Sequence, residues 1–131
     1  MLFDKQNLIS EDQTVISTCY SVNYVYFGPN DVSYLPFRIQ VSVDFAGLTG
    51  LSIDIETSKT QNFSSYEVLA TTTLPVDKLK AGAVFPISHV PKGNLGFLRL
   101  KYNVTGVGTA GRVYAGVVLS NDSSWQDIEV A

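Results

Sequence analysis

Few residues in this chain combine the side-chain chemistry and the spacing that catalysis or metal binding needs. The single histidine, His89, stands between Ser88 and Val90. A catalytic triad requires a histidine, a nucleophile and an acidic residue that converge in space, and the sequence has no Gly-x-Ser-x-Gly motif. No cysteine or acidic residue lies near His89 at a spacing typical of metal ligands. We therefore expect His89 to be a loop or rim residue, and we expect no enzymatic activity, metal or cofactor.

Two carboxylates and one thiol are the other candidates for chemistry. Asp54 and Glu56 lie two residues apart, so on a strand they share a face. Such a pair could bind calcium or cleave a glycosidic bond, but a solvated strand face opposite Ile53 and Ile55 is the favoured interpretation. Cys19 is expected to be a small buried hydrophobe. A single cysteine forms no intrachain disulfide, so nothing indicates an oxidising compartment.

Aromatic residues form the remaining cluster. Five of them fall within fifteen residues, and one more lies near the end of the chain: Tyr20, Tyr24, Tyr26, Phe27, Tyr34 and Trp125. On alternating strand positions Tyr20, Tyr24 and Tyr26 share one face. Tyrosine buries area and keeps a polar tip, which suits a protein interface. A platform that stacks sugars and a second core face remain open as alternatives.

The elements that position these residues show a period of two. In residues 38–45 every second side chain is apolar: Ile39, Val41, Val43 and Phe45. A strand lines such residues up on one face, whereas a helix scatters them. Residues 51–56 and 97–104 alternate in the same way. One buried and one solvated face is typical of antiparallel sheets.

Weaker patterns complete the fold prediction. Further strands are predicted at residues 20–27, 67–73, 84–87 and 112–119. Glycine-rich turns are predicted at residues 47–50, 93–96 and 106–111. Short helical turns are predicted at residues 6–13, with Ser10 as the cap, and at residues 76–80 after Pro75. The sum is an all-β, antiparallel jelly roll or β-sandwich, with an N-terminal arm at residues 1–13 and one domain at residues 14–131.

Composition limits the classes of partner. The net charge of −3 and the pI near 4.9 argue against nucleic acid, because phosphate binding needs clustered basic residues. The opening residues lack a basic start and a long apolar run, so we expect no signal peptide, no membrane partner and synthesis in the cytoplasm. Only 16% of residues are charged, which fits either a chain packed in an assembly or simply a β-rich domain.

Several segments, in order, resemble one protein family. They are residues 1–13, 35–41, 45–47, 51–58, 79–82, 97–102 and 109–113. Together they resemble the small capsid cement, or decoration, proteins of tailed double-stranded DNA phages. Residues 28–33 depart from the pattern of that family.

The resemblance implies a jelly-roll domain on the outside of the phage head, made in the host cytoplasm. Its partners would be the major capsid protein, whose neighbouring subunits it would bridge, and further copies of itself as a homo-oligomer. An apolar arm at residues 1–10 could reach a neighbour or add to a sheet edge. The candidate interface residues are Leu2, Phe3, Leu8, Ile9, Tyr20, Tyr24, Tyr26, Tyr34 and Trp125.

Two other functions remain as alternatives. Jelly rolls often bind sugars, so a carbohydrate-binding module is the second hypothesis. A small hydrolase is the third, and it would need a nucleophile that converges on His89.

Overall fold

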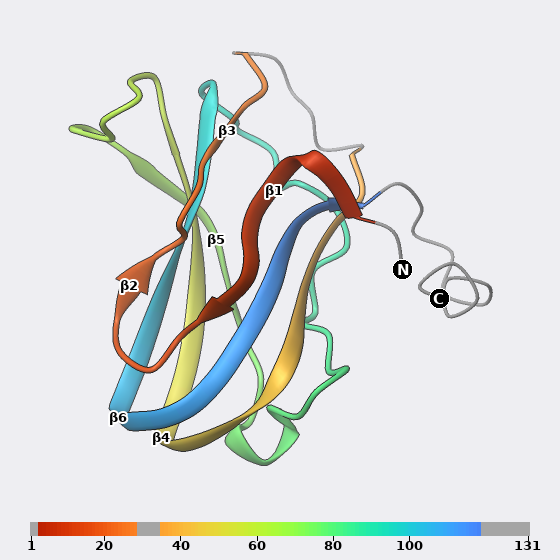
Figure 1. Cartoon of the computed structure of the whole chain (residues 1–131). Helices are drawn as coiled ribbons and strands as arrows, with labels where there is room; N and C mark the ends of the chain where they lie inside the picture. Colours follow the sequence, from red (N-terminus) through yellow and green to blue (C-terminus); the bar gives the residue numbers. More distant parts are fainter. Residues whose placement is uncertain (1–2, 29–34, 119–131) are drawn as a thin grey trace.

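A computed structural model describes residues 3–28 and 35–118, with the backbone alone for residues 3–7. Six strands and one short 3₁₀ helix follow one another along the chain (Figure 1): β1 (Phe3–Thr14), β2 (Cys19–Tyr20), β3 (Val25–Tyr26), β4 (Phe37–Ser58), β5 (Glu67–Thr73), η1 (Val76–Lys78) and β6 (Phe97–Val118). The prediction of an all-β fold is confirmed, and η1 confirms the helical turn predicted after Pro75.

The described strands form one six-stranded antiparallel sheet in the order β1-β6-β4-β5, and β2 and β3 also pair with β6. Its centre is the long ladder between β4 and β6, which runs from Phe37 opposite Val117 to Ser58 opposite Phe97. The predicted antiparallel pairing is therefore confirmed. The strand predicted at residues 67–73 has the same bounds as β5.

Both long strands bend in the middle. The register of the ladder shifts repeatedly between Val41 and Gly50. Gly47 has a φ of +88°, which favours glycine, and a Cβ at Gly111 would lie 2.4 Å from the ring of Phe45. The turns predicted at residues 47–50 and 106–111 are wrong, because the glycines let each strand bend and continue instead of reversing.

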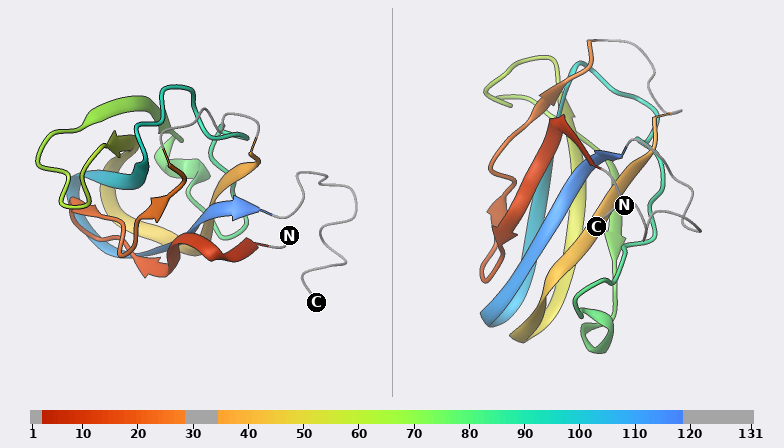
Figure 2. Two further views of the ribbon diagram at one scale, coloured as in Figure 1. Left: turned by 90° about the horizontal axis from the view of Figure 1, so that it is seen from above. Right: turned by 45° about the vertical axis from the view of Figure 1, so that its right-hand side comes forward.

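The bend divides the sheet into two halves, which diverge upward from it in Figure 1. The β5 half contains residues 51–58 of β4 and 97–105 of β6, flanked by β5 on one side and by β2 and β3 on the other. The β1 half contains residues 37–45 of β4 and 110–118 of β6, flanked by β1. Figure 2 shows the same curved strands from above and after a 45° turn about the vertical axis.

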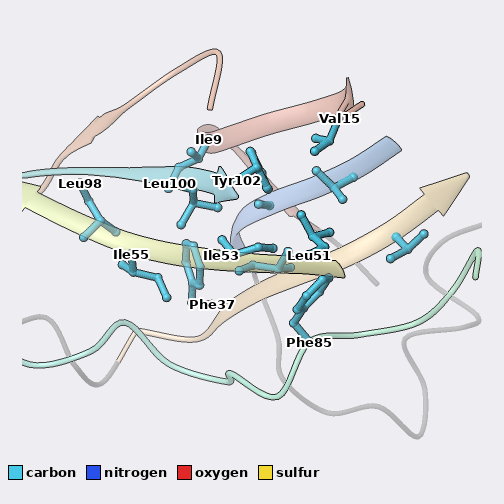
Figure 3. Close-up of a cluster of buried hydrophobic side chains, with 14 of the residues drawn as sticks. Ile9, Val15, Phe37, Leu51, Ile53, Ile55, Phe85, Leu98, Leu100 and Tyr102 are labelled. Atoms are coloured by element: carbon cyan, nitrogen blue, oxygen red, sulfur yellow. The ribbon is translucent and has the colours of Figure 1, made fainter. Parts of the chain in front are cut away.

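Side chains from both halves meet in a single core (Figure 3). Ile39 and Val41 come from the β1 half, and Ile55 and Leu100 from the β5 half; all four are fully buried. Within residues 38–45 the predicted alternation holds except at Val43, which is 41% exposed. The register shifts there because the bulged strand carries an extra residue, and this turns Val43 to the outer face.

Residues 79–96 close the open side of the core. Leu79, Phe85 and Val90 in this segment are buried. The N–H of Phe85 donates to the carbonyl of Ile39 at 2.9 Å, and Val84 forms a bridge with Gln40. The segment predicted as a strand at residues 84–87 therefore lies along the edge of β4. It forms a single β-bridge there and not a continuous strand.

The N-terminal segment, expected to be an arm, forms strand β1 against β6. The helical turn predicted at residues 6–13 is wrong. Ile9 and Ser10 are both fully buried although they are consecutive. Such a pattern has no period of two, because the pairing with β6 shifts register between Leu8 and Ser10.

A buried hydrogen-bond network joins the two halves. The Ser10 hydroxyl donates to Gln13 Oε1 at 2.7 Å, which leaves its oxygen to accept from the Tyr102 hydroxyl, also at 2.7 Å. Gln13 Nε2 donates to the carbonyl of Tyr20 at 3.0 Å. Burial raises the pKa of Tyr102, and the Ser10 hydrogen bond only partly offsets this. The network fixes β1 and β2 on β6.

Candidate interaction surface

Exposed tyrosines gather on the outer surface of the β5 half. Tyr20 on β2, Tyr24 and Tyr26 near β3, and Tyr66 before β5 are 44%, 40%, 60% and 45% exposed. Figures 1 and 2 show these segments close together, where the 59–66 connection lies beside β3 and the start of β6. We call these four tyrosines, with Phe97 and Arg99 between them, the aromatic face.

Phe97 anchors one side of the aromatic face. Its ring centre lies 4.6 Å from that of Tyr26 and 5.6 Å from that of Tyr24, at interplanar angles of 46° and 70°. Tilted and edge-to-face contacts of this kind are favourable between aromatic rings. The Gln61 side-chain amide donates to the hydroxyl of Tyr24 and so ties the 59–66 connection to the same ring.

Arg99 anchors the other side. Its guanidinium lies over the rings of Tyr20 at 3.9 Å, Phe63 at 4.2 Å and Tyr66 at 5.8 Å. Its Nε donates to Glu56 Oε1 at 2.9 Å. Contacts between a cation and an aromatic ring add to the ion pair. One side chain therefore holds β2, β4 and the 59–66 connection together.

The carboxylate of Glu56 is buried rather than solvated, so that part of the sequence prediction is wrong. Its side chain is 1% exposed. Although Glu56 points to the outer face, Arg99 and the folded 59–66 connection cover it. Phe63 in that connection is 5% exposed and has a φ of +53°. A non-glycine residue in this conformation is held by its surroundings.

Asp54 also has partners from its own chain. Thr71 donates its hydroxyl to Asp54 Oδ1 at 2.7 Å, and Asn103 Nδ2 donates to Oδ2 at 3.0 Å. The two carboxylates predicted as a pair are therefore engaged separately, Asp54 by Thr71 and Asn103 and Glu56 by Arg99. Within residues 3–28 and 35–118 no group of three histidine, cysteine or acidic side chains could hold a metal ion.

The other candidates for chemistry lie apart from this surface. His89 is exposed, as predicted, and its Nδ1 is 2.9 Å from the Ser88 hydroxyl. Cys19 is only half-buried against the core, and burial raises the pKa of its thiol, while a hydrogen bond from Gln13 lowers it to a smaller extent.

The candidate interface residues fall into three groups. Tyr20, Tyr24 and Tyr26 come together on the aromatic face. Leu8 and Ile9 pack into the chain's own core. Phe3 is described only by its backbone pairing with Val118, and Leu2, Tyr34 and Trp125 lie outside the described residues.

Sequence reasoning missed half of the aromatic face. Tyr66 stands in a different segment from Phe97 and Arg99, and nothing in the sequence links the two segments. Phe97 and Arg99 do alternate with buried Leu98 and Leu100, so their common outer face follows from the strand pattern. The approach of Phe63 and Tyr66 depends on how the 59–66 connection folds, which carries no such pattern.

These observations define the class of protein as an all-β domain with an exposed aromatic surface on one half of a bent sheet. The family model Bbp16 matches residues 9–117, which is most of the chain. The chain therefore belongs to the Bbp16 family, which is a family of phage proteins. A search of curated proteins gave no match. No helix within the described residues is long and apolar enough to cross a membrane.

Proposed function

We propose that this protein is a capsid cement protein, which binds the outer surface of the phage head and bridges neighbouring major capsid subunits. The observation that carries the proposal is the aromatic face, where four tyrosines are each 40–60% exposed on one half of the sheet. Tyrosine is enriched at protein interfaces and among the residues that dominate binding energy. Membership of a phage protein family supplies the setting.

A purely adhesive role accounts for the chemistry of the surface. The carboxylates of Asp54 and Glu56 are engaged by Arg99, Thr71 and Asn103, and His89 lies apart. These groups support binding area rather than turnover, so we propose that the protein is not an enzyme. It would act without a cofactor and without nucleic acid or membrane as a partner.

We propose a homo-oligomeric arrangement on the shell. Copies attached to a symmetric lattice bind with an avidity that single contacts lack, because each further contact forms at high effective concentration. Closed symmetry is the usual outcome when identical chains meet.

We also propose that the bent sheet is a form of jelly roll. The two halves pack their inner faces against one core, as the two sheets of a jelly roll do. Here β4 and β6 run through both halves without interruption. An experimental structure of the whole chain in which the halves separate into two four-stranded sheets would support this assignment, and an open single-layer sheet would contradict it.

The test uses capsids from a phage that lacks this gene. The purified full-length chain is mixed with these capsids and sedimented, and the bound fraction is measured against protein concentration. We expect saturable binding at a fixed number of copies per capsid, together with a higher temperature of capsid disruption. Absence of saturable binding would overturn the proposal.

One observation favours carbohydrate binding as a second candidate. An open depression beside the aromatic face is lined by Tyr24, Thr60, Gln61 and Asn62. Aromatic rings stack on sugars, and amides bind hydroxyl groups. A glycan array and isothermal titration with the array's best ligand would test it. Saturable glycan binding together with failure to bind capsids would favour this candidate over the cement role.

A further inference from the structure

We propose that the aromatic face is the surface that docks on the capsid, and that the outer surface of the β1 half points away from the shell. This inference rests on the proposed cement function and adds the orientation of the protein and the chemistry of the partner. Since the inner faces of the two halves share one core, their outer faces look in opposite directions.

The exposed area favours a capsid subunit over a second copy of this chain. The four tyrosines are 40–60% exposed, which amounts to on the order of 400 Å² at ~200 Å² for each residue. A stable interface buries about 800 Å² on each partner. The four tyrosines alone supply about half of that area, which favours a contact repeated on a shell over an isolated dimer. An area of this size suffices on a shell, where repeated contacts act together.

The face is also arranged in advance of binding. The Arg99–Glu56 ion pair, the rings stacked on Arg99, and Phe97 hold all four tyrosines from the inside. Side chains that are already ordered lose little conformational entropy when a partner binds. A fixed aromatic cluster thus has the properties of a binding hot spot.

Hydrogen bonding defines what the partner must present. The hydroxyls of Tyr20, Tyr26 and Tyr66 make no hydrogen bond to the described residues. Lys101 lies 5.8 Å from the Tyr20 ring centre and forms no ion pair within that part of the chain, because its cross-strand neighbour Asp54 bonds to Thr71 and Asn103. The matching surface of a capsid subunit carries aliphatic side chains for the rings, with carbonyl or carboxylate oxygens around them.

The described part of the outer surface of the β1 half carries no cluster of exposed tyrosines. Its ladder carries polar residues, with Arg38 opposite Gly116 and Gln40 opposite Tyr114. Asp12 accepts a hydrogen bond from Ser42 at 2.7 Å and pairs with Arg112 at 3.2 Å. A surface with polar side chains and an exposed ion pair suits the side of the protein that stays in solvent.

The experiment compares variants of the full-length chain for binding to capsids that lack the protein. Tyr26→Asp and Tyr66→Asp place a charge on the aromatic face, and we expect each to weaken binding at least tenfold. Tyr26→Phe keeps the ring and loses only the hydroxyl, so we expect a change of two- to fivefold. Val107→Asp is the matched control, because Val107 is 79% exposed and lies at the bend, away from the face; its binding should stay within twofold of the parent chain.

A second measurement protects the test against misfolding. Tyrosine nitration is compared between the free parent chain and the chain bound to capsids, and peptides that contain Tyr20, Tyr24, Tyr26 and Tyr66 should be protected only on the capsid. Full nitration of these residues on the capsid would overturn the inference, as would folded aspartate variants that bind like the parent. Variants that bind capsids like the parent, but change the oligomeric state of the free chain or its glycan binding, would also overturn the inference. Failure of the parent chain to bind capsids would instead overturn the proposed function.

Discussion

The outer surfaces of the two halves carry the same kind of ion pair in different surroundings. On the β5 half the side chains of Arg99 and Glu56 are 18% and 1% exposed, and aromatic rings surround the guanidinium. On the β1 half those of Arg112 and Asp12 are 49% and 40% exposed. Water screens the second pair and not the first, so only the first can hold a surface in a fixed shape.

The strongest way to break this comparison is to remove one partner of the buried pair. Arg99→Ala leaves the Glu56 carboxylate buried without a countercharge and removes the stacking surface for Tyr20. We expect the free energy of unfolding to fall by about 3 kcal/mol, measured by urea denaturation. The double variant Arg99→Met with Glu56→Leu removes both charges and should recover much of the loss.

The link between the halves gives the next largest effect. Tyr102→Phe removes the buried hydroxyl that bonds to Ser10 and should lower the free energy of unfolding by about 1–2 kcal/mol. Thermal unfolding followed by circular dichroism measures the change. A loss below 0.3 kcal/mol, on the order of the measurement error, would show that the network contributes little.

The same residue predicts a pH dependence. Burial raises the pKa of Tyr102, so the folded chain keeps its phenol protonated where the unfolded chain ionises. The stabilisation is complete below the pKa of the unfolded state, about 10, and declines as the pH rises above it. Tyr102→Phe should flatten the decline in stability above pH 10. The Cys19→Ala background is used, since burial also raises the pKa of Cys19.

Stacking on the guanidinium gives a smaller effect. Tyr20→Ala removes the ring that lies 3.9 Å from Arg99 and should cost about 1 kcal/mol in the free energy of unfolding. Tyr20→Phe keeps the ring and should unfold at the same urea concentration as the parent chain. Equal losses in both variants would mean that the hydroxyl, and not the ring, stabilises this region.

The exposed pair gives the smallest effect and completes the comparison. Arg112→Ala should change the free energy of unfolding by less than about 0.5 kcal/mol, and high salt should abolish even that difference. Urea titrations at low and high ionic strength measure it. A loss as large as that of Arg99→Ala would remove the distinction between the two halves.

Alternation of apolar and polar residues predicted the strands that form the core. Ile39, Ile53 and Leu100 are buried as expected, because the ladder around each of them keeps its period of two. The prediction failed at Val43 and in β1, where register shifts break the period. It also failed at the glycines, because glycine permits a bend as readily as a reversal.

The candidate surface was predicted in part. Tyr20, Tyr24 and Tyr26 are close in sequence and lie on neighbouring strands, so their common face was accessible to sequence reasoning. Burial of Glu56 was not, since it depends on Arg99 from another strand and on Phe63 from a connection without a periodic pattern. Contacts between distant segments follow from tertiary packing, which local spacing does not encode.

The uninterrupted course of β4 and β6 through the bend has a mechanical consequence. A load applied at one outer surface travels to the other along two covalent backbones, which pair with each other on both sides of the bend. Pulling the halves apart would therefore have to straighten both polypeptides at their glycines against the packed ring of Phe45. We therefore expect the two halves to respond to tension as one body rather than to move independently about a hinge.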